Sequence, residues 1–259
     1  MLFRSTDERW DNWVETFLAA RYNCSARTLR RYLGAWGHWR AFIELNRIGI
    51  PRALGYQQVL DFISWRSSQV KRRSRKRVSK NTALCDVRVM AVVMREAVRR
   101  GYADTNHCEK LGITKDPSRQ KPEMTDSEIL RIRTELKRRP EWMRHSFEIA
   151  LHQGCRLSET SFPLSQVDLA RQTITFHGKG RGGGTKNVFT TQLHPNLHAL
   201  FARMIAEGKD YSCALPVMAA KEWHTLFREI GLPHLCFHCT RVTVITRMAR
   251  EGVPIAQAM

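Results

Sequence analysis

The spacing of apolar residues over the first hundred positions predicts four helices. The first apolar face recurs at intervals of three and four residues and consists of Trp10, Trp13, Val14, Phe17 and Leu18. Similar spacing continues over residues 25–43, 57–67 and 84–98, with Ser25 as the expected cap of the second helix. Four such helices can bury a core of their own. We expect the indole rings of this region to lie in that core.

After residue 124 the pattern predicts both helices and strands. Thr125 followed by Glu128 is a capping box, so we expect a helix to begin there and another to run from Glu141 to a turn at Gly154. Alternating β-branched residues predict short strands over 165–169 and 173–177 and a returning strand over 188–191. Helices are expected again over 195–207 and 221–230 and after residue 238.

The polar, proline-containing segment from Thr114 to Pro122 separates these two patterns and is typical of a linker. We therefore predict a mainly α protein with two domains. The helical domain spans residues 1–112, the linker 113–123, and the second domain 124–259. The second domain is mostly helical with a small antiparallel β-sheet.

The charge of the chain points to a polyanionic partner. Its 259 residues contain 43 Lys and Arg against 24 Asp and Glu, a formal net charge of +19 and a pI near 10.3. Nucleic acid is the commonest partner of proteins with such an excess of positive charge. No apolar run approaches the length of a membrane-spanning helix, and Met1 to Glu8 lack an apolar signal core. We expect a cytoplasmic protein associated with the bacterial nucleoid.

The strongest basic cluster lies between the third and fourth predicted helices. It consists of Lys71, Arg72, Arg73, Arg75, Lys76 and Arg77, and Lys80 follows at the start of the next helix. A solvated loop or a targeting signal is one interpretation. Because helices bound the run on both sides, we favour contact with the DNA backbone. The second helix adds Arg27, Arg30 and Arg31 to the predicted DNA-binding residues, and Lys186 is a further one.

Seven scattered cysteines argue against a disulfide framework. Cys236 and Cys239 form a CxxC motif with His234 and His238 beside them, so a zinc-dependent regulator is conceivable. No second ligand pair with finger-like spacing lies nearby, and we predict no metal.

Three further motifs carry candidate chemistry. The sequence Gly154-Cys155-Arg156-Leu157-Ser158-Glu159 places an arginine after a glycine turn, although an ordinary surface ion pair with Glu159 is the simpler interpretation. A glycine-rich hairpin over residues 178–186 contains Lys179 and Lys186 and lacks the ending and following helix of a phosphate-binding P-loop. His238 and Arg241 begin the last predicted helix.

The order of these motifs, downstream of a basic helical domain and a linker, resembles the tyrosine recombinases, also called the phage-integrase family. The resemblance covers nearly the whole chain. It implies a SAM-like core-binding domain over 1–112 and an integrase-like DNA breaking-rejoining domain over 124–259. It also implies a site-specific recombinase that acts on double-stranded DNA through a 3′-phosphotyrosyl intermediate, as a tetramer when full length, with no membrane and no small-molecule cofactor.

Two guanidinium groups, Arg156 and Arg241, can stabilise the charge that develops on phosphate oxygens in the transition state. His238 can hydrogen-bond the phosphate or move a proton, and Glu159 would orient Arg156. The resemblance further implies that Lys179 protonates the leaving 5′-oxygen. Lys186 is its rival, because extra glycines leave the hairpin register open.

The sequence departs from the family pattern in one respect. The family has a nucleophilic tyrosine after the second arginine, whereas the five tyrosines here all precede Arg241. We therefore expect a recombinase chain truncated before its nucleophile, which binds DNA and forms no covalent link unless a tyrosine is supplied in trans. The alternative is a catalytically inactive protein that occupies recombination sites.

Overall fold

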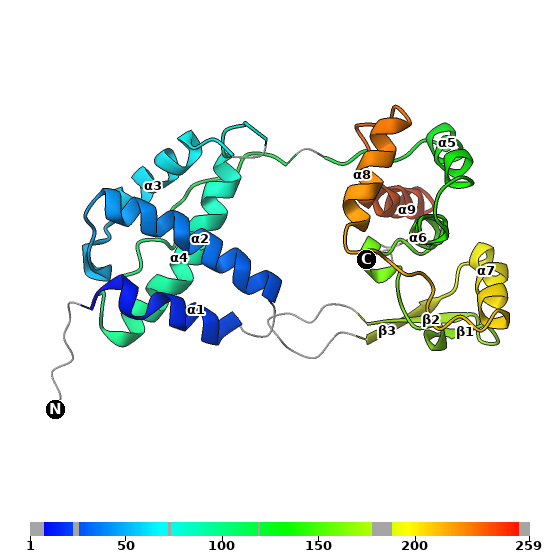
Figure 1. Ribbon diagram of the computed structural model, residues 1–259, viewed down its shortest axis with the longest axis horizontal. Helices are drawn as coiled ribbons and strands as arrows, with labels where there is room; N and C mark the ends of the chain where they lie inside the picture. The colour runs from blue at the N-terminus through cyan, green and yellow to red at the C-terminus, as the bar shows by residue number, and fades with distance from the viewer. Residues whose placement is uncertain (1–7, 23–25, 72–73, 119, 178–187, 254–259) are drawn as a thin grey trace. The chain divides into compact units, whose positions relative to one another are not determined.

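The computed structural model describes residues 8–22, 26–71, 74–118, 120–177 and 188–253 (Figure 1). The chain divides into two compact units, Met1–Ser118 and Arg119–Met259. The division falls inside the segment predicted as a linker. Both units are mainly helical, and the predicted fold class is confirmed.

Unit 1 contains the four predicted helices. Its elements are α1 (Val14–Tyr22), α2 (Ala26–Leu45), α3 (Tyr56–Ser68) and α4 (Lys80–Arg100), with short 3-10 turns at Trp10–Asn12 and Pro51–Ala53. Helix α4 packs against both α2 and α3. It begins where the Oγ of Ser79 accepts a hydrogen bond from the backbone N–H of Thr82 at 3.3 Å, and it ends at Gly101, whose φ of 78° is the left-handed conformation that glycine adopts readily. The cap predicted at Ser25 lies outside the described residues.

Aromatic side chains form the core of unit 1. Trp10, Trp13 and Trp36 are all buried, as predicted. Trp39 and Phe62 stack with ring centroids 3.5 Å apart. These rings belong to one continuous apolar cluster, so the tryptophans of this unit hold the helices together.

Unit 2 combines helices with a three-stranded sheet. Its helices are α5 (Asp126–Leu136), α6 (Glu141–Gln153), α7 (Pro195–Ala206), α8 (Ala219–Glu229) and α9 (His238–Arg250). Its strands are β1 (Val167–Asp168), β2 (Thr173–His177) and β3 (Val188–Gln192), which pair antiparallel in that order. Strands β2 and β3 are in register from Thr173 opposite Gln192 to His177 opposite Val188. The predicted hairpin pairing is therefore confirmed.

The first predicted strand is shorter than expected. Residues Leu164–Gln166 form a 3-10 turn, and only Val167 and Asp168 pair with β2. The turn begins after Pro163, whose carbonyl accepts a hydrogen bond from the N–H of Gln166 at 3.0 Å. The N–H of Leu164 donates to the carbonyl of Asp210 at 2.8 Å. These backbone groups are satisfied outside the sheet, so the strand begins later than alternation suggested.

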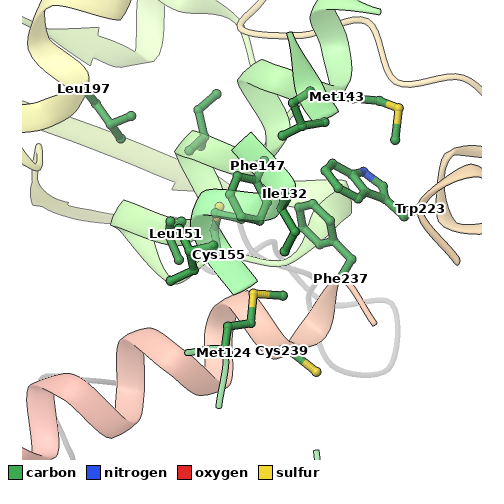
Figure 2. Close-up of a cluster of buried hydrophobic side chains, with 14 of the residues drawn as sticks. Met124, Ile132, Met143, Phe147, Leu151, Cys155, Leu197, Trp223, Phe237 and Cys239 are labelled. Carbon is green, nitrogen blue, oxygen red and sulfur yellow. The ribbon is translucent and has the colours of Figure 1, made fainter. Parts of the chain in front are cut away.

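Helices α6 and α9 pack against each other in unit 2. Figure 2 shows side chains of the buried apolar cluster of this unit. Phe147 on α6 and Trp223 on α8 are fully buried and stacked at 5.8 Å, and Phe237 packs on Trp223 at 4.9 Å. The capping box at the start of α5 is present: the N–H of Glu128 donates to Thr125 Oγ1 at 3.3 Å, and the N–H of Thr125 donates to Glu128 Oε2 at 2.8 Å. The packing of α9 fixes the residues at its first turn.

Among the described helices, none combines the length and the apolar composition needed to span a bilayer.

Candidate phosphate-binding site

The glycine turn after α6 brings α9 close to it. Gly154 ends α6 with a φ of 64°, and a Cβ added there would lie 3.1 Å from Cγ1 of Val244 on α9. The guanidinium of Arg241 donates from Nη1 to the carbonyl oxygen of Gly154 at 2.6 Å. This bond joins residues 87 positions apart. The two motifs that the sequence singled out therefore meet at one point of unit 2.

Arg156 lies two residues after this turn and is held by Glu159. The backbone N–H of Arg156 donates to one carboxylate oxygen of Glu159 at 2.8 Å, and its Nη1 donates to the other at 2.7 Å. The ion pair that the simpler interpretation required is thus present. Nevertheless, the side chain of Arg156 remains 61% exposed. A carboxylate on one edge orients the guanidinium while its remaining surface stays accessible.

His238 is the first residue of α9 and is exposed. Partial burial lowers the pKa of His238, and the positive charges of Lys121, Arg241 and Arg156 lower it further. Charge effects of this kind require proximity. Cationic side chains from three separate segments therefore lie near one imidazole, and their charges disfavour its protonated form.

Lys121 is the residue of this cluster that the sequence did not single out. Lys121 falls in the predicted linker, whereas the structure places its Nζ 3.0 Å from Sγ of Cys236. The two residues are 115 positions apart, and no local pattern links them. The CxxC motif draws attention to Cys236, but only the tertiary contact identifies Lys121.

The two cysteines of this motif are neighbours, with Sγ atoms 3.8 Å apart. Burial opposes ionisation of Cys236, but hydrogen bonds from Lys121, Cys239 and the backbone N–H of His238 give it a lowered pKa. Burial raises the pKa of Cys239 to about 11. Over the described residues, no three His, Cys, Asp or Glu side chains are arranged to hold a metal ion.

The glycine-rich hairpin lies outside the described residues. Lys179 and Lys186 stay predictions for that reason. The last pair of the described ladder, His177 and Val188, flanks the segment that contains both lysines.

The cations predicted on α2 are at the surface of unit 1. Arg27, Arg30 and Arg31 are all exposed. Arg40, on the same helix, differs from them because it lies within 3.6 Å of the carboxylates of Asp11, Glu15 and Glu44. Acidic neighbours therefore compensate Arg40, while the first turns of α2 present their charge to solvent.

The described residues of the basic segment before α4 are joined by backbone hydrogen bonds. Val70 and Arg77 form an antiparallel bridge, and the N–H of Lys71 donates to the carbonyl of Lys76 at 2.9 Å. Arg75 has a φ of 55°, and its N–H donates to the carbonyl of Lys71 at 3.0 Å. Within the described ranges, no acidic side chain pairs with the exposed cations Lys71, Arg75, Lys76 and Arg77. Lys80 lies 3.9 Å from Asp116, and Arg72 and Arg73 fall outside the described residues.

Comparison with solved structures identifies the fold as that of integrases. The match to a lambda integrase dimer bound to a COC′ core site covers 97% of this chain and 93% of the integrase chain, with a TM-score of 0.67 and 16% sequence identity. The Tn1549 transposon integrase in complex with a circular intermediate DNA matches 94% and 89%, with a TM-score of 0.63 and 16% identity. A lambda integrase tetramer bound to a Holliday junction matches 99% and 77%, with a TM-score of 0.62 and 17% identity. No family model and no curated protein matches the sequence.

Proposed function

We propose that this chain is a site-specific DNA recombinase of the tyrosine recombinase family and that unit 2 binds one DNA phosphodiester between Arg156, His238 and Arg241. The observation that carries the proposal is the hydrogen bond from Arg241 to the carbonyl of Gly154, which brings the motif of Arg241 and His238 to the turn that precedes Arg156. The integrase fold and the DNA-bound state of the matching integrases support it.

The chemistry of the cluster fits a phosphodiester under attack. Breaking the ester places additional negative charge on the non-bridging oxygens, and fixed guanidinium groups stabilise that charge without a metal or a nucleotide. Glu159 and the carbonyl of Gly154 hold the two arginines before DNA arrives. The imidazole of His238, whose pKa is lowered by burial and by the neighbouring cations, is able to hydrogen-bond the phosphate or to accept a proton.

The nucleophile and the proton donor for the leaving group complete the proposed mechanism. All five tyrosines precede Arg241, and only Tyr211 belongs to residues 119–259. Strand cleavage through a 3′-phosphotyrosyl bond would therefore use a tyrosine from outside these 259 residues. Lys179 is proposed to protonate the leaving 5′-oxygen, with Lys186 as the alternative. A protein that binds DNA without cleaving it would use the same phosphate contacts.

Unit 1 would contribute DNA binding that does not depend on the base sequence of the DNA. Exposed arginines of α2 and the basic turn before α4 are suited to phosphate contacts, which set affinity and its dependence on salt. Assembly of several copies on DNA, as in the lambda integrase dimer and tetramer, is part of the same proposal.

Two substitutions on one helix test the proposed phosphate site. Arg241→Lys keeps the charge and removes the bidentate fork, and Arg250→Lys makes the same change where the arginine pairs with Glu123 at 2.6 and 2.8 Å. We expect Arg241→Lys to weaken binding to a randomised duplex pool about tenfold, equivalent to about 1.4 kcal/mol, and Arg250→Lys to have little effect. Fluorescence anisotropy measures both, and circular dichroism checks folding.

Equal affinities for the two variants would contradict the phosphate site. A covalent adduct assay on nicked duplex then separates enzyme from binding protein. We expect residues 1–259 alone to form no adduct. A phosphotyrosyl adduct mapped to any of the five tyrosines would overturn the proposed source of the nucleophile.

A further inference from the structure

The CxxC motif before α9 is a chemical site that the proposed recombination mechanism does not use. Cys236 is partly exposed and its Sγ lies 3.0 Å from Nζ of Lys121, while the fully buried Cys239 lies 3.8 Å away. The backbone N–H of Cys236 also points to Sγ of Cys239 at 3.4 Å. The two sulfurs are therefore in van der Waals contact.

We propose that Cys236 and Cys239 form a reversible dithiol–disulfide pair in which Lys121 activates the thiol of Cys236, and that oxidation releases Lys121 to bind a phosphate beside His238. The second half of this proposal rests on the proposed function. The first half concerns the chain alone.

The surroundings assign different roles to the two sulfurs. Cys236 receives hydrogen bonds from an ammonium group and from the first backbone N–H of α9, which stabilise a thiolate. Cys239 belongs to the apolar core beside Met124 and Phe237 (Figure 2). An accessible thiolate next to a less ionised, buried thiol is the arrangement in which the first sulfur attacks and the second resolves.

A low-molecular-weight disulfide such as oxidised glutathione is the oxidant. The thiolate of Cys236 attacks one glutathione sulfur, and one glutathione leaves as its thiolate. Cys239 then loses its proton to solvent and attacks the Cys236 sulfur, which expels the second glutathione. The protein dithiol loses two electrons and two protons, and oxidised glutathione is reduced to two glutathione molecules.

Oxidation changes the charge beside His238. In the reduced protein the ammonium group of Lys121 has a sulfur partner that carries negative charge when ionised. A disulfide carries no charge and is a poor acceptor, so Nζ of Lys121 loses this partner. The net positive charge around His238 rises, and we expect one additional phosphate contact.

Thiol trapping on the full chain tests the first half. The chain is equilibrated in glutathione buffers of increasing oxidised fraction, quenched with acid, alkylated and mapped by mass spectrometry. We expect an intramolecular Cys236–Cys239 bridge that dithiothreitol reverses. In Cys239→Ser we expect a mixed disulfide with glutathione at Cys236. Cys85, which is also partly exposed, is the internal reference.

Alkylation rates at neutral pH test the role of Lys121. We expect Lys121→Met to slow modification of Cys236 about three- to tenfold and to leave Cys85 unchanged. Lys221→Met, which removes an exposed lysine elsewhere in unit 2, is the charge-matched control and should change neither rate. Cys236 that reacts no faster than Cys85, or that stays reduced while Cys85 is glutathionylated, would overturn the proposal.

The DNA half has its own readout. We expect the oxidised chain to bind duplex DNA with a salt dependence steeper by about 0.9 in log–log slope than the reduced chain, and Lys121→Met to abolish the difference. Identical slopes in both redox states would overturn the release of Lys121. Absence of DNA binding in both states would refute the proposed function and this step together, while trapping would still decide whether the dithiol pair exists.

Discussion

The two units present positive charge in different ways. Residues 1–118 contain 23 Lys and Arg against 11 Asp and Glu, and residues 119–259 contain 20 against 13. In unit 1 the cations before α4 are neighbours in sequence and exposed on one short turn. In unit 2 the cations around His238 come from distant segments, and Glu159 and the Gly154 carbonyl hold two of them. A run of basic residues along the chain is thus enough to attract a polyanion, whereas a binding site for one phosphate requires tertiary structure.

The largest effect on DNA binding should come from removing the basic turn of unit 1. Replacing Lys71, Arg75, Lys76 and Arg77 with alanine should lower affinity for duplex DNA by about 10²–10³-fold near 0.1 M salt, because each lost phosphate contact reduces the log–log salt slope by about 0.9. Titrations at several salt concentrations measure both quantities. A control with the same charge change replaces four cations that already pair with carboxylates, namely Arg52, Arg95, Lys209 and Arg250. If the control lowers the slope equally, net charge alone governs binding and the distinction between the units fails.

Core substitutions compare the stability of the two units. Trp39→Ala and Trp223→Ala each remove a fully buried indole and should each cost about 3–5 kcal/mol of unfolding free energy. Trp39 Nε1 donates to the carbonyl of Asp86 at 3.0 Å, whereas Trp223 Nε1 is buried without a partner among the described residues. Trp→Phe should therefore cost more at position 39 than at 223, because Trp39→Phe removes a buried hydrogen bond to Asp86, whereas Trp223→Phe removes an N–H that has no partner among the described residues. Calorimetry of the four variants would contradict this if the order were reversed.

Glu148 should give unit 2 an acid-sensitive stability. Burial opposes its ionisation, but hydrogen bonds from His152 and Arg133 lower the pKa of Glu148 to about 2. A carboxyl whose folded pKa is lowered stabilises the native state above its unfolded pKa, and this stabilisation is lost as the pH falls toward 2. The loss should approach roughly 3 kcal/mol between about pH 5 and pH 2. Urea unfolding as a function of pH, with Glu148→Gln as the comparison, measures it, and parallel curves for the two proteins would contradict the assignment.

The smallest predicted effect concerns the glycine turn. Gly154→Ala should cost about 1–2 kcal/mol, because alanine disfavours a φ of 64° and its Cβ would crowd Val244 at 3.1 Å. Gly101→Ala is a matched comparison, since Gly101 has a φ of 78° and no heavy atom within 4 Å of an added Cβ. Gly154→Ala should be the more destabilising of the two and should also weaken DNA binding. If the two substitutions lower the unfolding free energy equally, the side chain of Val244 can move away from the added Cβ at little cost.

Much of the fold could be predicted because its signals are local. The cap at Thr125 lies where the sequence placed it, and the strands Thr173–His177 and Val188–Gln192 follow the predicted alternation. The shortened first strand shows the limit, because a hydrogen bond to Asp210 satisfied the backbone of Leu164.

The site was predictable only in part. Arg156, His238 and Arg241 stand in recognisable motifs, and the structure brings them together. Lys121 stands in no motif, and its role depends on a thiol 115 residues away. A residue whose importance arises from a distant partner leaves no trace in local spacing, whereas a cap or an alternating strand does.

The hydrogen bond from Arg241 to the end of α6 determines when the arginine side chain loses its conformational freedom. A free arginine loses up to about 2 kcal/mol of rotamer entropy when it is immobilised. Because the Gly154 carbonyl already restrains this side chain, much of that loss occurs while the protein folds and not when a ligand arrives. The fork awaits its anion in a nearly fixed orientation, and loosening the carboxyl end of α6 would transfer the entropic cost to the encounter with DNA.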